Sequence, residues 1–383
     1  MNNQIIIIGG GASALMLASL LPKQTVTLLE SNAKLGAKIL ISGGGKCNIT
    51  NTQMGTEYYL GDADFIAPSL KSFNEKSLLK WLERQGLEPE LRKGTQYFCK
   101  TSAKELLDIF SKEAKKQNIC LTEQVLSISK RDDIFYVKTN KKTYTSKAVV
   151  VASGGLSFPN LGASPIGYEV AEHFGHSIIK TAPALVGFTV QKEQFFFKTL
   201  SGVSTEVSIK VGKDVCKGAL LFAHKGVSGP AVLDASLYWE KGKIEVDFVP
   251  DFSWKSVTGS KKQISSLLPL PKRVTKAFLL ELNLEDKPYH KLNQEELDKL
   301  HTLSSYTFAP AGTFGYSKAE VTKGGVETSE IDSLTMMSKK EEGLYFLGEV
   351  LDVTGRLGGY NFQWAFSSAY SCTKSIKRKI NGE

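Results

Sequence analysis

Three small residues near the amino terminus have the types and spacing needed to hold a phosphate. Gly9, Gly11 and Ala14 form the pattern G-x-G-x-x-A directly after the apolar run 5–8. Glycines let the chain turn sharply and let backbone amides approach a pyrophosphate at the start of the following helix. Glu30 stands about 20 residues after the first glycine, where a carboxylate accepts hydrogen bonds from ribose hydroxyls. Together these features predict a βαβ unit that binds an adenine dinucleotide.

A second glycine-rich loop follows at residues 42–51, which read SGGGKCNITN. A plain NAD(P) dehydrogenase has no need of such a loop so soon after the first one, whereas a longer dinucleotide does. The glycines allow the backbone to approach a ligand closely. Donors for phosphate or ribityl oxygens are available at Lys38, Lys46, Asn48 and Thr50.

This loop resembles the G-x-K-[IL]-L-x-S-G-G-G-[RK]-C-N-x-T-N signature of the BaiN-like flavoproteins, also called the aminoacetone-oxidase family. Segments 152–162, 221–230 and 348–363 share the resemblance, so that it extends from one end of the chain to the other. It implies an FAD-dependent oxidoreductase with a glutathione-reductase-like FAD-binding fold. Ala14 stands where glycine is usual in the family, and Lys46 keeps a positive charge without the bidentate fork of the more common arginine.

The predicted cofactor-binding residues come from segments at both ends of the chain. They are Gly9, Gly11, Ser13, Ala14, Glu30, Lys38, Gly43, Gly44, Gly45, Lys46, Cys47, Asn48, Thr50, Val125, Ala152, Gly154, Gly155, Gly348, Glu349, Asp352, Gly358, Gly359, Tyr360 and Asn361. The resemblance assigns Val125 to the adenine. Glu349 is expected to bind the ribityl chain, because ligands bind at strand ends in open sheets, although single acids often serve as caps. The helix beginning near Asn361 would direct its positive end at the flavin.

The catalytic groups are less strongly indicated than the cofactor site. His224 lies in a glycine-bounded loop and is a candidate for acid–base chemistry or substrate contact, the alternative being a histidine bonded to nearby backbone. Tyr360 would shield the flavin or pack at an interface. Cys47 could act as a redox thiol, although buried cysteines are usually inert. Weaker candidates for the substrate side are Tyr316, Thr322 and Lys323.

The elements that must position these residues form an α/β protein. We predict a Rossmann-like FAD-binding domain built from residues 1–185 and 326–383. Residues 186–325 form an inserted, β-rich substrate domain with a helical subdomain at about 253–304, because strand patterns at 187–191, 205–211 and 243–248 give way there to helical ones.

Composition limits the partners and the compartment. The net charge of +9 is spread along the chain, so an anionic cofactor or small substrate is favoured and nucleic acid is not. The five cysteines form no C-x-x-C pair, so no metal site is expected. The apolar stretch 5–21 lacks a basic flank and is interrupted by glycines, which favours a cytoplasmic protein without a membrane anchor.

The reaction is expected to transfer a hydride between flavin N5 and a small organic substrate, in amine oxidation or in NAD(P)H-linked reduction. No second G-x-G-x-x-G follows a strand, so NADH or NADPH would act as a transient reductant without a domain of its own. Two alternatives stay open. One is an RNA-associated flavoprotein that uses its basic surface, and the other is a plain NAD(P) dehydrogenase without flavin.

Overall fold

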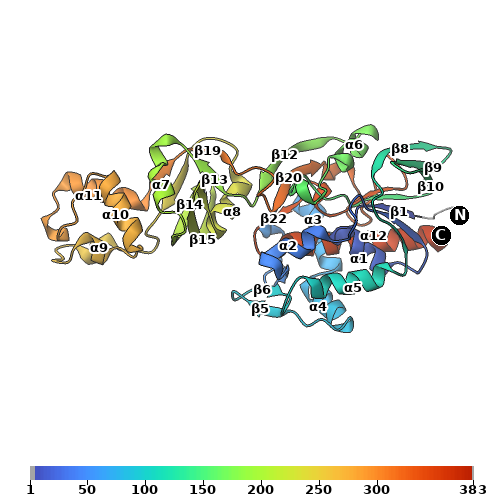
Figure 1. The fold of residues 1–383 in the computed structure, drawn as a ribbon, viewed down its shortest axis with the longest axis horizontal. Helices are drawn as coiled ribbons and strands as arrows, with labels where there is room; N and C mark the ends of the chain where they lie inside the picture. The colour runs from blue at the N-terminus through green and yellow to red at the C-terminus, as the bar shows by residue number, and fades with distance from the viewer. Residues whose placement is uncertain (1–4, 382–383) are drawn as a thin grey trace. The chain divides into compact units, whose positions relative to one another are not determined.

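The chain is divided into two compact units in the computed structural model, which describes residues 5–381. Unit 1 comprises the chain up to Pro183 and from Glu320 onward, and unit 2 comprises Ala184–Ala319. In Figure 1 the colours from green to orange mark unit 2, which is inserted in the sequence between the two segments of unit 1. The boundaries predicted from the sequence are 185/186 and 325/326. In the structure, unit 1 resumes earlier, at Glu320, and the strand β20 (Val321–Val326) therefore belongs to unit 1 and not to the insertion.

Unit 1 is built on a five-stranded sheet with the order β21-β11-β1-β2-β7, and all of its neighbouring strands are parallel. The strands are β1 (Ile5–Ile8), β2 (Val26–Leu29), β7 (Asn118–Cys120), β11 (Val149–Val151) and β21 (Leu344–Phe346). Four of them are buried along their whole length and apolar except for Thr27 in β2, because both faces of the sheet are covered. The carboxyl-terminal part of the chain supplies the edge strand β21, which makes the sheet a product of both termini.

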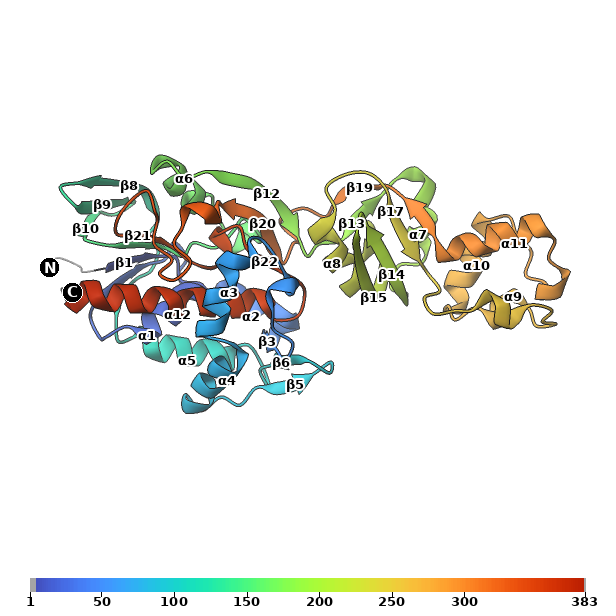
Figure 2. The same ribbon diagram turned by 180° about the vertical axis from the view of Figure 1, so that it is seen from behind.

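Two helices from opposite ends of the chain pack together beside this sheet. They are α1 (Ala12–Leu20) and α12 (Tyr360–Asn381), and α5 (Lys104–Ala114) packs against α1 in turn. Figure 2 shows α12 in red alongside α1 and α5 in blue and teal. The middle of α1 is buried all round, from Ser13 to Ala18, so it has no polar face.

Smaller elements complete unit 1. The helices are α2 (Ala37–Gly45), α3 (Ala63–Ser72), α4 (Glu75–Arg84) and α6 (Ile166–His173). One three-stranded sheet contains β8 (Val125–Arg131), β9 (Ile134–Thr139) and β10 (Thr143–Ser146), and a second contains β3 (Asn48–Asn51), β5 (Glu90–Arg92) and β6 (Gln96–Phe98). Two-stranded pairs join β4 (Tyr59–Leu60) to β22 (Thr354–Gly355) and β12 (Ile178–Ala184) to β20.

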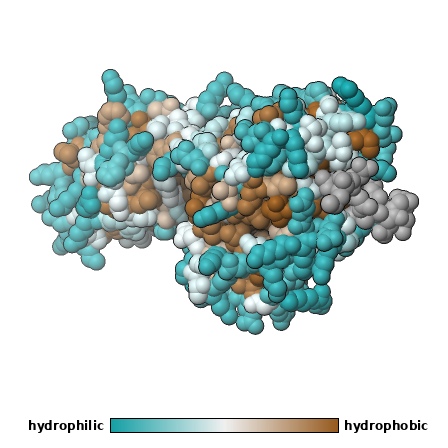
Figure 3. Space-filling model, turned by 45° about the vertical axis from the view of Figure 1, so that its right-hand side comes forward, coloured by the Kyte–Doolittle hydropathy of each residue, from teal (hydrophilic) through white to brown (hydrophobic). Residues whose placement is uncertain are grey.

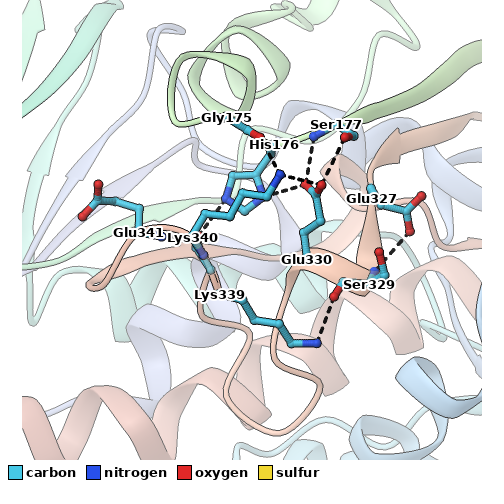
Figure 4. A network of polar contacts seen from close by, with 10 residues as sticks. Gly175, His176, Ser177, Glu327, Ser329, Glu330, Lys339, Lys340 and Glu341 are labelled. Carbon is cyan, nitrogen blue, oxygen red and sulfur yellow. Dashed lines mark hydrogen bonds and ion pairs between the residues drawn. The ribbon is translucent and has the colours of Figure 1, made fainter.

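A polar network centred on Glu330 ties α6 to the segment that precedes β21. Glu330 accepts hydrogen bonds from the Ser177 amide at 2.8 Å and the Ser177 hydroxyl at 3.1 Å, and it pairs with Lys340 (Figure 4). The His176 ring lies 3.2 Å from Glu330 through Nδ1 and 2.7 Å from the Ser338 hydroxyl through Nε2. We call His176, Ser177, Glu330, Ser338 and Lys340 the Glu330 network. Its polar groups are satisfied within the protein.

Unit 2 is built on a seven-stranded sheet with the order β18-β17-β14-β15-β16-β13-β19. The strands are β13 (Phe188–Val190), β14 (Ser204–Val211), β15 (Asp214–Ala223), β16 (Gly226–Ser228), β17 (Ile244–Asp247), β18 (Tyr306–Phe308) and β19 (Pro310–Thr313). The helices α7 (Phe196–Thr199) and α8 (Pro230–Tyr238) accompany the sheet. Phe197 is at the centre of the aromatic core, with Phe222, Phe248 and Phe278 around it.

The predicted helical subdomain consists of short helices with a proline-containing break between them. Its elements are the 3-10 turn η4 (Trp254–Val257) and the helices α9 (Ile264–Leu267), α10 (Lys272–Glu281) and α11 (Gln294–His301).

The face of the protein drawn in Figure 3 is mainly polar, with one group of apolar residues near its centre. Within residues 5–381, no helix combines the length and the apolar character needed to cross a membrane.

Candidate functional site

The first glycine turn connects β1 to α1 and requires glycine for two reasons. Gly9 has a φ of +103°, which side-chain-bearing residues rarely adopt. A Cβ atom at Gly9 would also lie 2.5 Å from the carbonyl oxygen of Ala152, at the end of β11. Gly9 and Ala152 therefore set how closely the ends of two neighbouring strands approach each other.

Gly11 differs from Gly9 because it faces open space. Its φ of −86° is accessible to any residue, and a Cβ atom there would meet nothing within 4 Å. Helix α1 begins directly after it, with no side-chain cap and no acidic residue in its first turn. The first amides of a helix have no intrahelical acceptor, and the helix dipole is positive at this end. The turn can therefore receive an anion such as a pyrophosphate.

Glu30 holds the same turn together from the end of β2. One carboxylate oxygen accepts from the Gly10 amide at 2.6 Å, and the other accepts from the Asn32 amide at 2.7 Å. The carbonyl oxygen of Glu30 accepts a hydrogen bond from the amide of Glu123 at 2.9 Å. Glu123 precedes Val125, the first residue of β8, by two residues. The acid predicted for the ribose and the residue assigned to the adenine thus belong to adjoining segments.

The second glycine loop is partly helical, which the sequence did not indicate. Helix α2 extends to Gly45, but Ser42, Gly43 and Gly44 have non-helical backbone angles. A Cβ atom at Gly43 would lie 2.7 Å from the amide nitrogen of Asn48, whereas one at Gly44 or Gly45 would meet nothing within 4 Å. Gly43 closes the loop on itself, and the next two glycines leave space beside the backbone.

Asn48 provides the test of whether a cofactor fits this space. Its Nδ2 donates to Oε1 of Gln96 at 2.8 Å, while its buried Oδ1 has no hydrogen-bond partner among the described residues. A buried acceptor without a donor costs about 1–3 kcal/mol. FAD carries suitable donors in its ribityl hydroxyls and flavin N3–H, so the residues present fit the cofactor. Gln96, which binds Asn48, is not among the residues predicted from the sequence, because it lies on a different strand.

The rest of β3 fixes the start of α12. The Thr50 hydroxyl, fully buried, donates to Oε1 of Gln363 at 2.7 Å, and Asn51 Nδ2 donates to the Gly358 carbonyl at 3.0 Å. A Cβ atom at Gly359 would lie 2.7 Å from the Thr50 backbone. Thr50, which was predicted to bind the cofactor, is thus engaged inside the protein and positions the amino terminus of α12.

Lys38 and Glu349 form an ion pair of 2.7 Å between the two ends of the chain. The second oxygen of Glu349 accepts from the Thr322 amide at 2.9 Å. A Cβ atom at Gly155 would lie 2.5 Å from the Thr322 hydroxyl and 2.7 Å from Glu349, whereas Gly154 faces open space. Thr322, a weaker candidate in the sequence, therefore lies at the centre of this group.

Gly348 packs closely against both α1 and α12. A Cβ atom at Gly348 would lie 2.9 Å from the hydroxyl of Ser13. Ser13 and Ala14 are both buried.

Asp352 is partly buried, and burial raises its pKa, with a further contribution from the charge of Glu327. Lys46 follows Gly45 at the end of the second glycine loop, and its carbonyl oxygen accepts a hydrogen bond from the Cys99 amide at 3.0 Å.

Cys47, Tyr360 and Asn361 point into the protein. Cys47 is fully buried, and burial raises the pKa of its thiol well above the usual value, which disfavours the reactive thiolate. The Tyr360 ring is 5% exposed and stacks on Tyr58 with centroids 4.8 Å apart. Asn361 exchanges two hydrogen bonds with the Gly355 backbone, at 2.8 and 2.9 Å. Packing, the alternative considered for Tyr360, agrees with this arrangement.

His224 belongs to unit 2, at the turn between β15 and β16. Strand pairing joins Ala223 to Gly226, so His224 and Lys225 form a two-residue hairpin turn, and both are exposed. A Cβ atom at Gly226 would lie 2.2 Å from the Phe188 carbonyl oxygen, which explains this glycine by strand packing. Among the described residues, none forms a hydrogen bond with the His224 ring, so the backbone-bonded alternative is not what the structure contains.

The parallel sheet, the open glycine turn before α1 and the carboxyl-terminal helix that meets it define a flavoprotein oxidoreductase with a Rossmann FAD-binding fold. The chain belongs to the family described as HI0933-like protein Rossmann domain, whose model matches residues 3–375. The predicted fold class and the predicted family resemblance are confirmed.

Two relatives match almost the whole chain. A Haemophilus influenzae protein named ribosomal RNA dihydrouridine synthase is 37% identical over 395 residues, with 98% of each chain covered. The 3-dehydro-bile acid delta(4,6)-reductase of Clostridium scindens is 30% identical over 403 residues, covering 96% of this chain and 97% of the relative. Among solved structures, FrdA of Escherichia coli quinol fumarate reductase has a TM-score of 0.50 and 12% identity, covering 100% of this chain and 71% of that one. That likeness concerns the fold alone.

Proposed function

We propose that this protein is an FAD-dependent reductase that converts a uridine of ribosomal RNA into dihydrouridine. The observation that carries the proposal is the 37% identity, over 98% of both chains, to the relative named ribosomal RNA dihydrouridine synthase. The conversion adds two hydrogen atoms across the C5–C6 double bond of uracil, which is conjugated with the C4 carbonyl. The substrate of the proposed reaction is therefore RNA, which the sequence analysis regarded as the less favoured alternative.

The second relative supports reduction over amine oxidation. Its name describes the reduction of double bonds in a 3-dehydro-bile acid, where a carbonyl can activate the double bonds by conjugation. Both names thus describe hydride addition to an electron-poor carbon–carbon double bond. NADH or NADPH would provide the electrons, and the reaction would take place in the cytoplasm, where ribosomal RNA is found.

The residues of unit 1 would bind and orient the cofactor. The first turn of α1 would hold the pyrophosphate, Glu30 the ribose, and Asn48 would accept a hydrogen bond from the flavin or its ribityl chain. Reduced FAD held by these residues would supply the hydride for uracil C6. A proton must then reach C5, so that one hydride and one proton complete the dihydrouridine.

We assign His224 as the candidate proton donor in this reaction. The ring is exposed in a hairpin turn and imidazole can donate a proton near neutral pH. Because the side chain supports no structural contact that the described residues reveal, His224→Gln should leave folding unchanged. We expect it to lower kcat about 100-fold, a typical loss for a general acid.

The proposed function is tested with ribosomal RNA from cells that lack the gene for this protein. The FAD-loaded protein is reduced anaerobically with NADPH or NADH, and RNA nucleosides are then analysed by mass spectrometry. A uridine that gains two hydrogen atoms at one position is the expected result. Reoxidation of the flavin by a small conjugated enone, with no change in the RNA, would instead indicate a small-molecule reductase. Bleaching of the flavin by a primary amine would indicate an oxidase.

A further inference from the structure

The charged residues of unit 2 are separated along the chain in its helical subdomain. Residues 252–280 contain no aspartate or glutamate, and we call them the basic segment. All of its cations are exposed: Lys255, Lys261, Lys262, Lys272, Arg273 and Lys276. Residues 281–304 contain twice as many acids as cations: Glu281, Glu285, Asp286, Glu295, Glu296 and Asp298 against Lys287, Lys291 and Lys299. The lobe therefore combines a strongly positive stretch with a more acidic one.

Ion pairing follows the same division. Outside the basic segment, Lys287 pairs with Glu296 and Lys299 pairs with Glu295, each at 2.7 Å. Within the described part of the chain, none of the six cations of the basic segment pairs with a carboxylate. Arg273 donates to the Thr199 carbonyl at 2.9 Å. Asp286 does contact the segment, but it accepts from the amide and hydroxyl of Ser265, at 3.0 and 2.6 Å.

Two helices of this lobe differ in their first turns. Helix α11 is capped by Asn293 in a reciprocal capping box with Glu296, and its first turn is acidic, as the helix dipole favours. Helix α10 begins with Lys272 and Arg273, has no side-chain cap and has no acid in its first turn. Cations at this end are unfavourable, because the helix dipole is positive there. The charges at the start of α10 therefore do not stabilise the helix, whereas a bound anion would offset their cost.

The apolar residues of α10 are used inside unit 2. Val274 and Phe278 are buried, and Phe278 contacts Phe197 and Phe248 of the core. Leu280 is exposed at the end of the helix. The helix thus presents mainly charge to solvent, which suits a phosphate-rich surface better than a lipid one, since interfacial helices insert an apolar face.

We propose that the basic segment binds the phosphodiester backbone of the RNA substrate and holds it on unit 2. This inference rests on the proposed function. It gives unit 2 a role in substrate binding, in addition to the role of unit 1 in binding the cofactor. Contacts with phosphates are independent of sequence and supply much of the affinity of RNA-binding proteins. The choice of uridine would be left to the site around the flavin.

The test removes the cations in two sets of three, in the FAD-loaded full-length protein. One variant is Lys272→Gln/Arg273→Gln/Lys276→Gln, and the other is Lys255→Gln/Lys261→Gln/Lys262→Gln. A matched control, Lys210→Gln/Lys213→Gln/Lys241→Gln, removes three exposed cations of unit 2 outside the basic segment. Binding of a ribosomal RNA fragment is measured by fluorescence anisotropy over a range of salt concentrations.

Each variant of the basic segment should bind the RNA at least about tenfold more weakly than the control. The slope of log Kd against log salt should fall by about 2, close to 0.7 per cation removed for single strands. Flavin reduction by NADPH should be unchanged in all variants. Equal RNA binding by both variants and the control would overturn the inference, as would the same loss for vesicles of anionic lipid as for RNA.

These outcomes separate the inference from the proposed function. If the variants bind RNA as the control does while the wild-type protein still forms dihydrouridine, the proposed function stands and the RNA is held elsewhere. If the wild-type protein neither binds nor modifies ribosomal RNA, both fail. All six side chains are exposed, so the variants should fold, which thermal unfolding checks directly.

Discussion

Two polar regions of unit 1 differ in whether their groups find partners within the protein. In the Glu330 network, carboxylate, imidazole, hydroxyl and ammonium groups satisfy one another. In the region that we call the cofactor cradle, defined by Gly9–Gly11, Gly43–Gly45, Asn48 and Gly154, several glycines face open space and Asn48 Oδ1 has no partner among the described residues. Satisfied groups stabilise the fold, whereas the unsatisfied cradle is arranged for a ligand.

The largest effects should come from the first two glycines of the motif, and they should differ in kind. At Gly9, alanine would place Cβ 2.5 Å from the Ala152 carbonyl oxygen and would require a φ of +103°. We expect Gly9→Ala to lower the free energy of unfolding of the apoprotein by several kcal/mol, since strain and overpacking each cost about 1–3 kcal/mol. FAD binding should be lost with it.

Gly11→Ala should affect the cofactor alone. The added methyl group would meet no protein atom within 4 Å and no strained backbone, but it would occupy the space beside the first turn of α1. We expect apoprotein stability to be unchanged and FAD to bind about 10- to 100-fold more weakly, as an overpacking cost of about 1–3 kcal/mol implies. Urea unfolding and flavin fluorescence titration measure the two quantities. Normal FAD affinity in Gly11→Ala would remove this turn from the cofactor site.

The opposite result is expected in the Glu330 network. Glu330→Gln removes the negative charge of a carboxylate that pairs with Lys340 and accepts a hydrogen bond from Ser177. We therefore expect the free energy of unfolding to fall by about 2–3 kcal/mol. FAD affinity should stay within twofold of wild type, because the network contributes no group to the cradle. Lys339→Gln, which loses only a hydrogen bond to the Ser329 carbonyl, is the control. Loss of FAD in Glu330→Gln at a temperature where it is folded would contradict the division.

The sequence points to the residues of the cradle but not to those of the network, because the cradle residues follow local patterns. Gly9, Gly11 and Glu30 occur at spacings set by one strand, one turn and one helix. His176, Glu330 and Ser338 belong to segments joined only by tertiary folding, and nothing in their order along the chain marks them as partners.

The same reason explains what the sequence could not show at Thr50 and in unit 2. Thr50 has a donor of the right type, but its partner Gln363 lies 313 residues away, so its role could not be read locally. Segment 221–230 appeared as a glycine-bounded loop and is largely a β-hairpin, because Gly226 is required by the approach of Phe188 and not by a turn.

A smaller effect should separate two asparagines of β3. Asn51 is satisfied at both ends, by the Gly358 carbonyl and by the Gln53 amide, whereas Asn48 lacks a partner at Oδ1. We expect Asn51→Ala to destabilise the apoprotein by about 1 kcal/mol or more. Asn48→Ala removes the hydrogen bond to Gln96, but it also removes a buried acceptor without a donor, so the two effects should offset each other and leave the apoprotein about as stable as wild type. With FAD present, Asn48→Ala should bind the cofactor about 5- to 50-fold more weakly.

The measurement for this pair is unfolding with and without saturating FAD. A smaller stabilisation by FAD in Asn48→Ala than in wild type is expected, because ligand stabilisation depends on affinity. If Asn48→Ala destabilises the apoprotein as much as Asn51→Ala does, Asn48 is a structural residue and the cradle is not prepared for a ligand at this atom.

The smallest effect concerns pH and belongs to the Glu330 network. Burial alone raises the pKa of Glu330, but the hydrogen bonds and charge of Lys340, with Ser177, outweigh it and hold the pKa at about 2 instead of 4.5. Burial lowers the pKa of His176 below 6.5, against the opposing effect of Glu330 and with a small contribution from Lys340. In both cases the unfolded chain takes up protons more readily than the folded one, so stability must fall as pH falls.

The loss should begin below pH 6.5, through His176, and should steepen below pH 4.5, through Glu330. Urea midpoints measured across this range should show the second phase in wild type and a weaker one in Glu330→Gln, where glutamine does not titrate. Gly11→Ala should follow the wild-type curve, because its substitution lies in the cradle. A wild-type curve that runs parallel to that of Glu330→Gln down to pH 3.5 would mean that Glu330 has no depressed pKa, and the network would then contribute packing without charge.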